Sequence, residues 1–361
     1  MMKNICIVTG ARPNFVKVAP IIRAIHRASD EGADVACQLV YAGSEKDSTL
    51  EPTLFDDLQM PHPDFYLGVD CASLNELTGR VMGEFEQYLN AHPTDVVIVV
   101  DDLASTMAVA IVTKKRGIRL AHLVAGTRSF DITMPKEINR LVIDGLSDLL
   151  FTAGVSSNSN ATREGAEMHK IYMVGNILMD SLRLSHGRLR RPSVLDKLGL
   201  DASGYVVFTL NRRALLADKD NLRQMLEAVV ATGLPVVAPL RDESAKVVKS
   251  LRLTAPQFHV VSPLPYLEFG WLTAHAKAII TDSGNVAEEA TFNGVPCITL
   301  NSYTEHIETV KQGSNVLVGE DAARLSDALA VLQRGEWKKC SLPDRWDGRT
   351  AERIVQTLLA M

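Results

Sequence analysis

The sequence predicts an α/β protein made of two doubly wound domains, each built on a parallel sheet. Short apolar, β-branched runs alternate with stretches of helical periodicity along the whole chain, and this alternation is typical of parallel sheets. The run Val96–Val100 is apolar throughout, as expected of a central strand that is buried on both faces. The length of 361 residues suits two domains of ordinary size.

The first half shows the strand and helix patterns in strict alternation. Strands are expected at residues 5–8, 35–41, 96–100, 119–124, 148–152 and 170–174. Helical periodicity follows the first strand as far as residue 25, and it returns over 74–89, from 105 onward and over 138–146. The stretch 61–69 predicts an irregular connection.

The second half repeats this order. Strands are expected at residues 205–210, 235–239, 258–261, 277–280 and 296–300, and helices over 221–230, from Asn285 onward and over 351–359. Gly175-Asn176 is interpreted as a hinge between the halves. The sequence therefore predicts an N-terminal domain over residues 1–174 and a C-terminal domain over residues 175–345.

The composition limits the classes of partner. The formal net charge is −5 and no basic block occurs, so neither nucleic acid nor an anionic membrane is an expected partner. No apolar run is long enough to span a bilayer, and the N-terminus enters a strand pattern at once instead of forming a signal peptide. Five cysteines without a CxxC pair fit a reducing, cytoplasmic compartment.

The stretch 278–290 carries the strongest sign of a binding site. An apolar strand is followed by a tight turn at Ser283-Gly284 and then by a helix that opens near Asn285. Unpaired N–H groups at such a helix start favour an anion, and small residues let a phosphate approach the backbone. A carboxylate one turn further could accept both hydroxyls of a ribose. The pattern indicates a nucleoside diphosphate site, with an ordinary turn capped by Ser283 as the alternative.

Polar residues follow two other predicted strands. Arg12 lies in the loop after the first strand, with Lys17 one turn further on, and Asp101-Asp102 follow the strand 96–100. Ligands of open α/β sheets collect at such carboxyl ends. The two acids are interpreted either as a helix cap or as a polar catalytic group.

Several segments, in order along the chain, resemble motifs of one family. They are Gly10-Ala11-Arg12-Pro13, Phe55-Asp56-Asp57-Leu58, Pro63-Asp64-Phe65-Tyr66-Leu67, Ala125-Gly126-Thr127-Arg128-Ser129-Phe130-Asp131, Met134-Pro135-Lys136-Glu137-Ile138-Asn139-Arg140, Val174-Gly175-Asn176, 281–289 and 313–319. The chain resembles the non-hydrolysing UDP-N-acetylglucosamine 2-epimerases from residue 3 to about residue 330. The resemblance implies two Rossmann-like domains facing a cleft, the glycosyltransferase-B architecture. It also implies a homodimer and a C-terminal helix, about 346–361, that packs back on the N-terminal domain, which agrees with the amphipathic pattern of that helix.

The resemblance implies that the nucleotide side of the site is complete. Phe269 matches the residue that stacks on uracil, the turn at Ser283-Gly284 matches the diphosphate turn, and Glu289 matches the ribose carboxylate. The full set of expected UDP-sugar ligands is Arg12, Lys17, Arg128, Asn211, Arg212, Phe269, Ser283, Gly284, Asn285, Glu289, Thr304 and Glu305.

The catalytic side departs from the family pattern. Val124 stands where the pattern has an acid, Lys136 where it has a glutamate and Asn211 where it has a histidine. Asp102 matches the surviving acid, although Asp101 replaces the glycine before it. The expected catalytic residues are therefore Asp102, Lys136 and Glu137, without a metal or cofactor. Each lost acid or base typically costs 10²–10⁴-fold in rate.

Three functions are compatible with this pattern. The first is a UDP-N-acetylglucosamine 2-epimerase-like enzyme of cell-surface polysaccharide biosynthesis that acts on UDP-N-acetylglucosamine or a modified UDP-amino sugar with an altered catalytic set. The second is a glycosyltransferase with a UDP-sugar donor, in which Asp102 would orient or deprotonate an acceptor. The third is a non-catalytic paralogue that binds a UDP-sugar. In each case the expected partner is UDP or a UDP-sugar.

Overall fold

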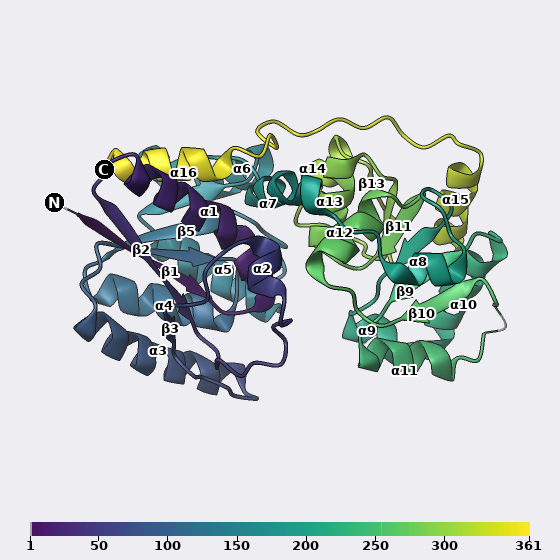
Figure 1. Cartoon of the computed structure of the whole chain (residues 1–361), viewed down its shortest axis with the longest axis horizontal. Helices are drawn as coiled ribbons and strands as arrows, with labels where there is room; N and C mark the ends of the chain where they lie inside the picture. Colours follow the sequence, from purple (N-terminus) through teal and green to yellow (C-terminus); the bar gives the residue numbers. More distant parts are fainter. Residues whose placement is uncertain (1, 254) are drawn as a thin grey trace. The chain divides into compact units, whose positions relative to one another are not determined.

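The computed structural model describes residues 2–253 and 255–361, and it divides into two compact units (Figure 1). The first unit comprises Met1–Leu184 and Asp344–Met361, and the second comprises Ser185–Pro343. Within the described residues, each unit contains one sheet, and every pair of neighbouring strands in both sheets is parallel. The predicted α/β class with two parallel sheets is confirmed.

The first unit is built on a seven-stranded sheet of order β3-β2-β1-β4-β5-β6-β7. Its strands are β1 (Lys3–Thr9), β2 (Val35–Tyr41), β3 (Phe65–Tyr66), β4 (Val96–Val100), β5 (Arg119–Ala125), β6 (Leu149–Thr152) and β7 (Ile171–Met173). Its helices are α1 (Arg12–Asp30), α2 (Leu54–Leu58), α3 (Leu74–Ala91), α4 (Ala104–Lys115), α5 (Pro135–Leu146), α6 (Val155–Arg163), α7 (Ile177–Ser185) and α16 (Thr350–Leu359). The strand order reverses between β1 and β4, which is where ligands of doubly wound sheets bind.

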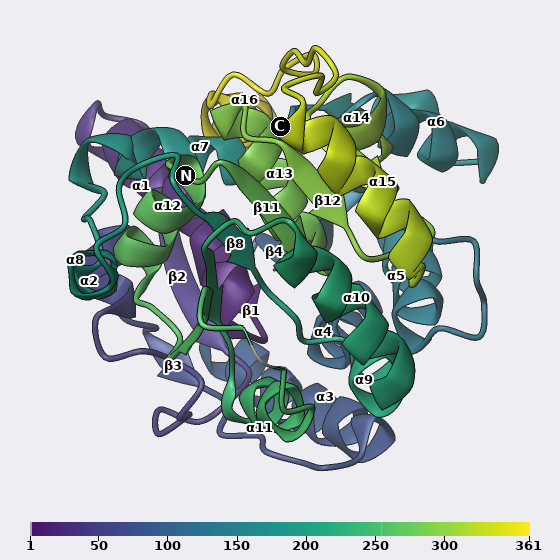
Figure 2. The ribbon, with the colours of Figure 1, turned by 90° about the vertical axis from the view of Figure 1, so that its right-hand side faces the viewer.

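The second unit is built on a six-stranded sheet of order β10-β9-β8-β11-β12-β13, of which β8, β11 and β12 are seen in Figure 2. Its strands are β8 (Val206–Phe208), β9 (Val236–Pro239), β10 (Phe258–Val261), β11 (Ala278–Thr281), β12 (Cys297–Thr299) and β13 (Asn315–Leu317). Its helices are α8 (Ser193–Leu198), α9 (Arg213–Ala217), α10 (Lys219–Ala231), α11 (Asp242–Ser250), α12 (Tyr266–Ala274), α13 (Gly284–Asn293), α14 (Ile307–Lys311) and α15 (Ala322–Gln333). Here the order reverses between β8 and β11.

Both faces of the second sheet are covered, because alternate strand residues point to opposite sides. Val206 and Phe208 pack with apolar residues of α10 and α15, whereas Val207 packs with those of α12 and α13. This double burial explains why the strands read as continuous apolar runs.

The boundary between the units lies ten residues later than the predicted boundary at 174/175. The reason is that α7 is fastened to the first unit: the Ser181 hydroxyl donates to the Val16 carbonyl, and the buried Asp180 accepts from two backbone N–H groups at the start of α16. The hinge residues Gly175 and Asn176 therefore precede a helix that still belongs to the first unit.

The C-terminal helix α16 belongs to the first unit and packs on α1, as Figure 1 shows at the two ends of the colour scale. Its apolar face is buried, with Ile354 and Leu358 fully enclosed. Asp180 Oδ1 and Oδ2 accept from the N–H groups of Ala351 at 2.8 Å and Thr350 at 3.1 Å, so this carboxylate caps the helix.

We expect Asp180→Ala to destabilise the docking of α16 by about 1–3 kcal/mol, because two buried N–H donors lose their acceptor. Hydrogen exchange of the α16 amides measures the change directly. The matched control is Glu352→Ala, which removes an exposed acid from the same helix and should change exchange by less than about 0.5 kcal/mol. Equal effects of the two variants would show that the cap contributes nothing.

The stretch 61–69, expected as an irregular connection, contributes the short edge strand β3. Phe65 and Tyr66 pair with Val40 and Tyr41, and the N–H of Leu67 donates to the Tyr41 carbonyl. A two-residue strand has too little periodicity to be visible in sequence. In the part of the chain that the structure describes, no helix is both long and apolar enough to cross a bilayer.

Candidate functional site

The carboxyl ends of β4 and β5 carry the charged residues of the first unit. Asp101 directly follows β4 and has a φ of 59°, in the left-handed region that favours glycine. Its Oδ1 lies 2.6 Å from Lys17 Nζ, and its Oδ2 accepts from Asn14 Nδ2 at 2.8 Å. The Lys17 side chain is buried, so the carboxylate of Asp101 balances a cation that was expected to face a diphosphate.

Asp102 is buried beside two cations of α5. Arg140 approaches one oxygen, Oδ2, from Nε at 2.9 Å and from Nη2 at 2.5 Å, and Lys136 Nζ lies 3.5 Å from Oδ1. Burial by itself raises the pKa of Asp102, but the positive charges of Lys136, Arg140 and Lys17 outweigh it and hold the pKa below its ordinary value. Asp102 is therefore a carboxylate at neutral pH, able to accept a proton or a hydrogen bond.

Lys136 of α5 forms an ion pair with Asp102. Its side chain remains 58% exposed, whereas that of Asp102 is 12% exposed. The lysine thus places an accessible positive charge next to a sheltered carboxylate.

Glu137 holds the loop that precedes α5. Its carboxylate accepts from Ser129 N and Oγ, both at 2.9 Å, and from Phe130 N at 3.1 Å, and Arg140 Nη1 lies 3.1 Å away. Burial opposes ionisation, but these donors lower the pKa of Glu137 below its ordinary range. Arg140 consequently bridges the two acids Asp102 and Glu137.

Arg12 and Arg128, both expected as UDP-sugar ligands, are held by carboxylates within the first unit. Arg12 Nε lies 3.0 Å from both oxygens of Glu51. The Arg128 side chain is 1% exposed and bonds Asp144 at 2.6 Å and Glu164 at 2.5 Å. This burial argues against direct contact between Arg128 and a ligand; its guanidinium instead joins the loop after β5 to α5 and to the segment after α6.

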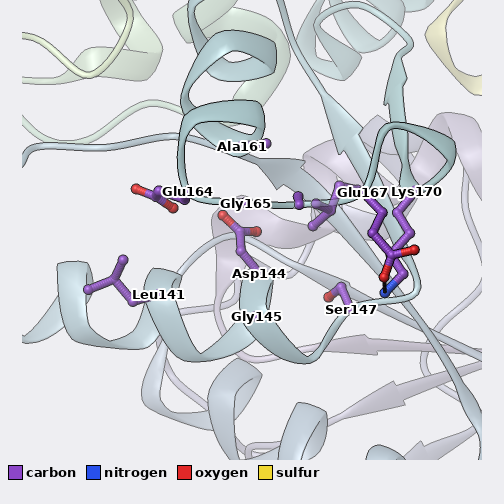
Figure 3. A pocket seen from close by; sticks show the side chains of 11 residues that line it. Leu141, Asp144, Gly145, Ser147, Ala161, Glu164, Gly165, Glu167 and Lys170 are labelled. Atoms are coloured by element: carbon purple, nitrogen blue, oxygen red, sulfur yellow. Dashed lines mark ion pairs between the residues drawn. The ribbon is translucent and has the colours of Figure 1, made fainter.

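A cavity of about 480 Å³ lies beside this arginine, between α5 and α6 (Figure 3). Asp144 and Glu164 line it, together with an ion pair of Glu167 and Lys170 at 3.2 Å. Among the described residues that line the cavity, none was predicted to be catalytic or to bind a UDP-sugar. This cavity is thus lined by other residues than those around Asp102.

In the second unit, the turn after β11 has the geometry of an anion site. Ser283 is the N-cap of α13 and Gly284 its first residue, so the N–H groups of the first turn have no partner inside the helix. The ring of His306 lies over this turn, because a Cβ on Gly284 would come within 2.9 Å of His306 Cδ2. His306 Nδ1 is 2.9 Å from the buried carboxylate of Glu288.

Asp282 joins this turn to the loop after β8. Its Oδ2 accepts from the N–H groups of Asn211 at 2.6 Å and Arg212 at 2.5 Å. Burial raises the pKa of Asp282 despite these two donors. Arg212 also bonds Asn301 at 2.9 Å and Glu320 at 3.0 Å, so three strand-end loops meet around it.

The structure brings together most of the nucleotide ligands expected in the second unit. Asn211, Arg212, Ser283 and Gly284 lie at adjoining strand ends, and the Thr304 hydroxyl accepts from the His306 N–H at 3.0 Å. Phe269 on α12 packs against the core cluster that α13 lines. Asn285 and Glu289 lie on α13 and Glu305 lies shortly before α14, and all three side chains are partly exposed.

The sequence interpretation missed several residues that shape these sites. They are Asn14, Arg140, Asp144, Glu288, Asp282 and the strand histidine His122, and each acts through a partner distant in sequence or buried in the core. A polar residue in an apolar strand was the one available signal, and it was present at His122.

Comparison with known proteins decides the family. The family model described as UDP-N-acetylglucosamine 2-epimerase matches residues 27–359. The chain belongs to the UDP-N-acetylglucosamine 2-epimerase family. The predicted family, its glycosyltransferase-B type fold and its assignment to the isomerases of UDP-sugars are thereby confirmed.

Two relatives that are named for different substrates have similar sequence identity to this chain. The chain is 31% identical over 370 residues to the UDP-N-acetylglucosamine 2-epimerase of Methanocaldococcus jannaschii, covering 98% of both proteins. It is 34% identical over 322 residues to the UDP-2,3-diacetamido-2,3-dideoxy-D-glucuronate 2-epimerase of Pseudomonas aeruginosa, covering 88% of each. Overall identity therefore does not choose between a neutral and an acidic sugar.

Solved structures support the same fold. The structure of the M. jannaschii UDP-GlcNAc 2-epimerase in complex with UDP-GlcNAc and UDP aligns over 99% of this chain and 100% of that chain, with a TM-score of 0.86 and 30% identity. The Neisseria meningitidis UDP-GlcNAc 2-epimerase, at 22% identity, aligns over 99% and 100% with a TM-score of 0.88 and supports the fold alone.

Of the three positions that depart from the family pattern, Val124 is the most unusual in its backbone. It has a φ of 69° at a register shift in the pairing of β5 with β6. A β-branched residue is a genuine outlier in the left-handed region. Asn211 is exposed, and its contact with Asp282 uses only its backbone N–H, so neither Val124 nor Asn211 supplies an ionisable group.

Proposed function

We propose that this chain is a UDP-sugar 2-epimerase with an altered catalytic set. Its substrate is UDP-N-acetylglucosamine or a modified UDP-amino sugar, and it works in the cytoplasm, as a homodimer, in cell-surface polysaccharide biosynthesis. The observation that carries the proposal is the carboxylate of Asp102, held ionised by Arg140 with the accessible ammonium of Lys136 at 3.5 Å. A base and an acid thus remain side by side although the acid expected at 124 is absent.

Epimerisation at C2 requires removal of a poorly acidic proton and its return to the opposite face. In the proposed mechanism, Asp102 takes the C2 proton while the bond between C1 and the UDP oxygen breaks. Lys136, whose exposed side chain leaves its ion pair with Asp102 when the sugar enters, then delivers a proton to C2 from the opposite face as UDP adds back to C1, so that no atom is gained or lost. Glu137 acts as a positioning residue, because its contacts hold the loop 127–134 and Arg140.

In this proposal, residues of the second unit bind the nucleotide. The N–H groups of the first turn of α13 receive the diphosphate, and Glu289 accepts the ribose hydroxyls. Phe269 stacks on the uracil. The relatives whose names and structures include UDP-GlcNAc or UDP support this part of the proposal.

We expect Glu289→Ala to weaken UDP binding by roughly 1.5–3 kcal/mol, the range for hydrogen bonds to a charged group. Isothermal titration calorimetry of the whole chain measures the change. Glu268→Ala, on the neighbouring helix α12, is the control and should leave the affinity within twofold. Unchanged affinity in Glu289→Ala would remove this residue from the site.

The charge of Lys136 predicts a preference for an acidic sugar. We expect UDP-2,3-diacetamido-2,3-dideoxy-D-glucuronate to be the better substrate, because an ammonium attracts a carboxylate that the family's glutamate would repel. Lys136→Glu should lower kcat/KM for this acidic sugar at least tenfold relative to kcat/KM for UDP-N-acetylglucosamine. Lys136→Gln, which removes the charge without reversing it, should give an intermediate ratio; equal ratios in all three proteins would contradict the prediction.

Incubation with each UDP-sugar, with and without candidate acceptors, separates this function from its alternatives. Formation of the C2 epimer without an acceptor supports the proposal. Release of UDP that depends on an acceptor would identify a glycosyltransferase, and binding without turnover would identify a non-catalytic paralogue.

A further inference from the structure

His122 lies in the middle of β5 with both ring nitrogens engaged. Its side chain is 2% exposed. Nδ1 is 2.6 Å from Asp144 Oδ1, and Nε2 is 2.9 Å from the carbonyl oxygen of Asp101. The imidazole therefore connects the buried acid of α5 to the turn that carries the catalytic residue Asp102.

The partners of His122 fix its protonation. A carbonyl oxygen accepts hydrogen bonds and cannot donate them, so Nε2 must carry a proton. Asp144 is held as an anion, because its Oδ2 accepts from Gly126 N at 3.0 Å and from Arg128 at 2.6 Å. Burial opposes its ionisation, but His122 and Arg128 together keep the pKa of Asp144 below its ordinary value. Nδ1 must then carry a proton as well, and only the imidazolium has both.

The charged groups around this ring are few and defined. Asp144 on α5 faces Nδ1, and Arg128, from the loop after β5, lies behind that carboxylate and also pairs with Glu164 of the segment after α6. On the other side, the Asp101 carboxylate is turned toward Lys17 while its carbonyl faces the ring. The network is thus a chain of alternating charges that ends at the turn.

The backbone of Asp101 has a conformation that must be held by hydrogen bonds. Asp101 is held at a φ of 59°, a conformation that costs an ordinary residue about 1 kcal/mol or more. Its N–H donates to the Leu123 carbonyl at 3.3 Å and its carbonyl accepts from His122, so both sides of the residue are fastened to β5. Rotation of this peptide would move Asp102, the next residue.

We propose that His122 is a positioning residue, a buried imidazolium that fixes the Asp101 carbonyl and thereby aims the carboxylate of Asp102 at the reacting carbon. The positioning role rests on the proposed function, whereas the positive charge of the His122 ring does not depend on it. The His122 imidazolium therefore holds the backbone of the turn, in addition to Arg140 and Lys136, which contact the carboxylate of Asp102.

Nitrogen-15 NMR of the wild-type chain, labelled in histidine, tests the charge without any assay of activity. The expected result is that both His122 nitrogens have protonated, imidazolium-type shifts at pH 7.5. One pyridine-type nitrogen would overturn the inference. Failure of the proposed function would appear separately, as absence of turnover with every UDP-sugar while the spectrum still shows the imidazolium.

Kinetics of His122→Gln test the positioning. The two N–H groups of Gln share one nitrogen, so they cannot reach both acceptors, which lie at different ring nitrogens of His122. A misplacement of about 1 Å can cost on the order of 10²-fold, so kcat should fall by about that factor with KM unchanged. His92→Gln, which alters a histidine bonded to the Tyr88 carbonyl at the end of α3, is the control and should keep kcat within twofold. Unchanged kcat in His122→Gln would overturn the role.

Asp144→Asn provides a second variant in case His122→Gln does not fold. Without the carboxylate, Nδ1 loses its anionic partner, so the histidine-labelled spectrum of the variant should show one pyridine-type His122 nitrogen at pH 7.5, and kcat should fall with KM unchanged. A variant that keeps both imidazolium-type shifts, or that keeps the wild-type kcat, would contradict the proposal.

Discussion

Asp102→Asn is expected to lower kcat for epimerisation by about 10²–10⁴-fold, the loss typical of a removed general base. Asparagine keeps the size of the side chain and can still accept from Arg140, but it cannot take the C2 proton. Steady-state kinetics with the preferred UDP-sugar measure the change, and UDP affinity by calorimetry should remain the same. A variant with wild-type kcat would remove Asp102 from the chemistry.

The matched control for Asp102 is its neighbour. Asp101→Asn removes a carboxylate of the same turn that pairs with Lys17, so it should have a much smaller effect on kcat. The lowered pKa of Asp102 adds a second expectation. A depressed pKa means that the ionised form persists until the pH falls below the ordinary range of aspartate, so Asp102 should produce no acid limb between pH 5 and 8.

Restoring the three family residues should raise activity on UDP-N-acetylglucosamine. The wild type is expected to convert this sugar slowly, and Val124→Glu, Lys136→Glu and Asn211→His together should increase kcat by on the order of 10²-fold. The increase will be smaller than the product of separate effects, because catalytic groups act as a unit. Two of these positions lie in the first unit and one in the second.

The geometry gives each of these changes a physical reason. Glutamate at 124 replaces a β-branched side chain at a φ of 69° with an unbranched one, which relieves part of the strain. Glutamate at 136 removes a cation that lies 3.5 Å from Asp102, and its loss raises the pKa of that base. Lys136→Gln as a single substitution adds no acid, so it should not increase kcat on UDP-N-acetylglucosamine. Robust conversion by the wild type would show that these positions matter less than we infer.

The sequence predicted the central strands and the strand-end turns, because continuous apolar runs and the residues that follow them are local features. The predicted strand 96–100 coincides with β4, and the predicted strand 277–280 overlaps β11, the strand before α13, to within one residue. The edge strand β3 was missed because two residues carry no period, and the unit boundary was placed too early because α7 is held by Asp180 and Ser181.

The partners of the site residues could not be predicted, because they are set by long-range packing. Asp101 and Lys17 are 84 positions apart, and His122 and Asp144 are 22 apart. The sequence shows that Arg128 is positively charged, but it does not show whether the guanidinium contacts a ligand or other side chains. The fold shows that it pairs with the acids Asp144 and Glu164.

Incorporation of deuterium at C2 of the sugar tests the proposed epimerase function most directly. The whole chain is incubated in deuterated water with UDP-2,3-diacetamido-2,3-dideoxy-D-glucuronate and, separately, with UDP-N-acetylglucosamine, and the products are analysed by mass spectrometry. We predict a C2 epimer that carries one deuterium at C2, formed without an acceptor and faster from the acidic sugar. UDP-sugars that are bound but recovered without deuterium, or UDP released only when an acceptor is present, would contradict the proposed epimerase.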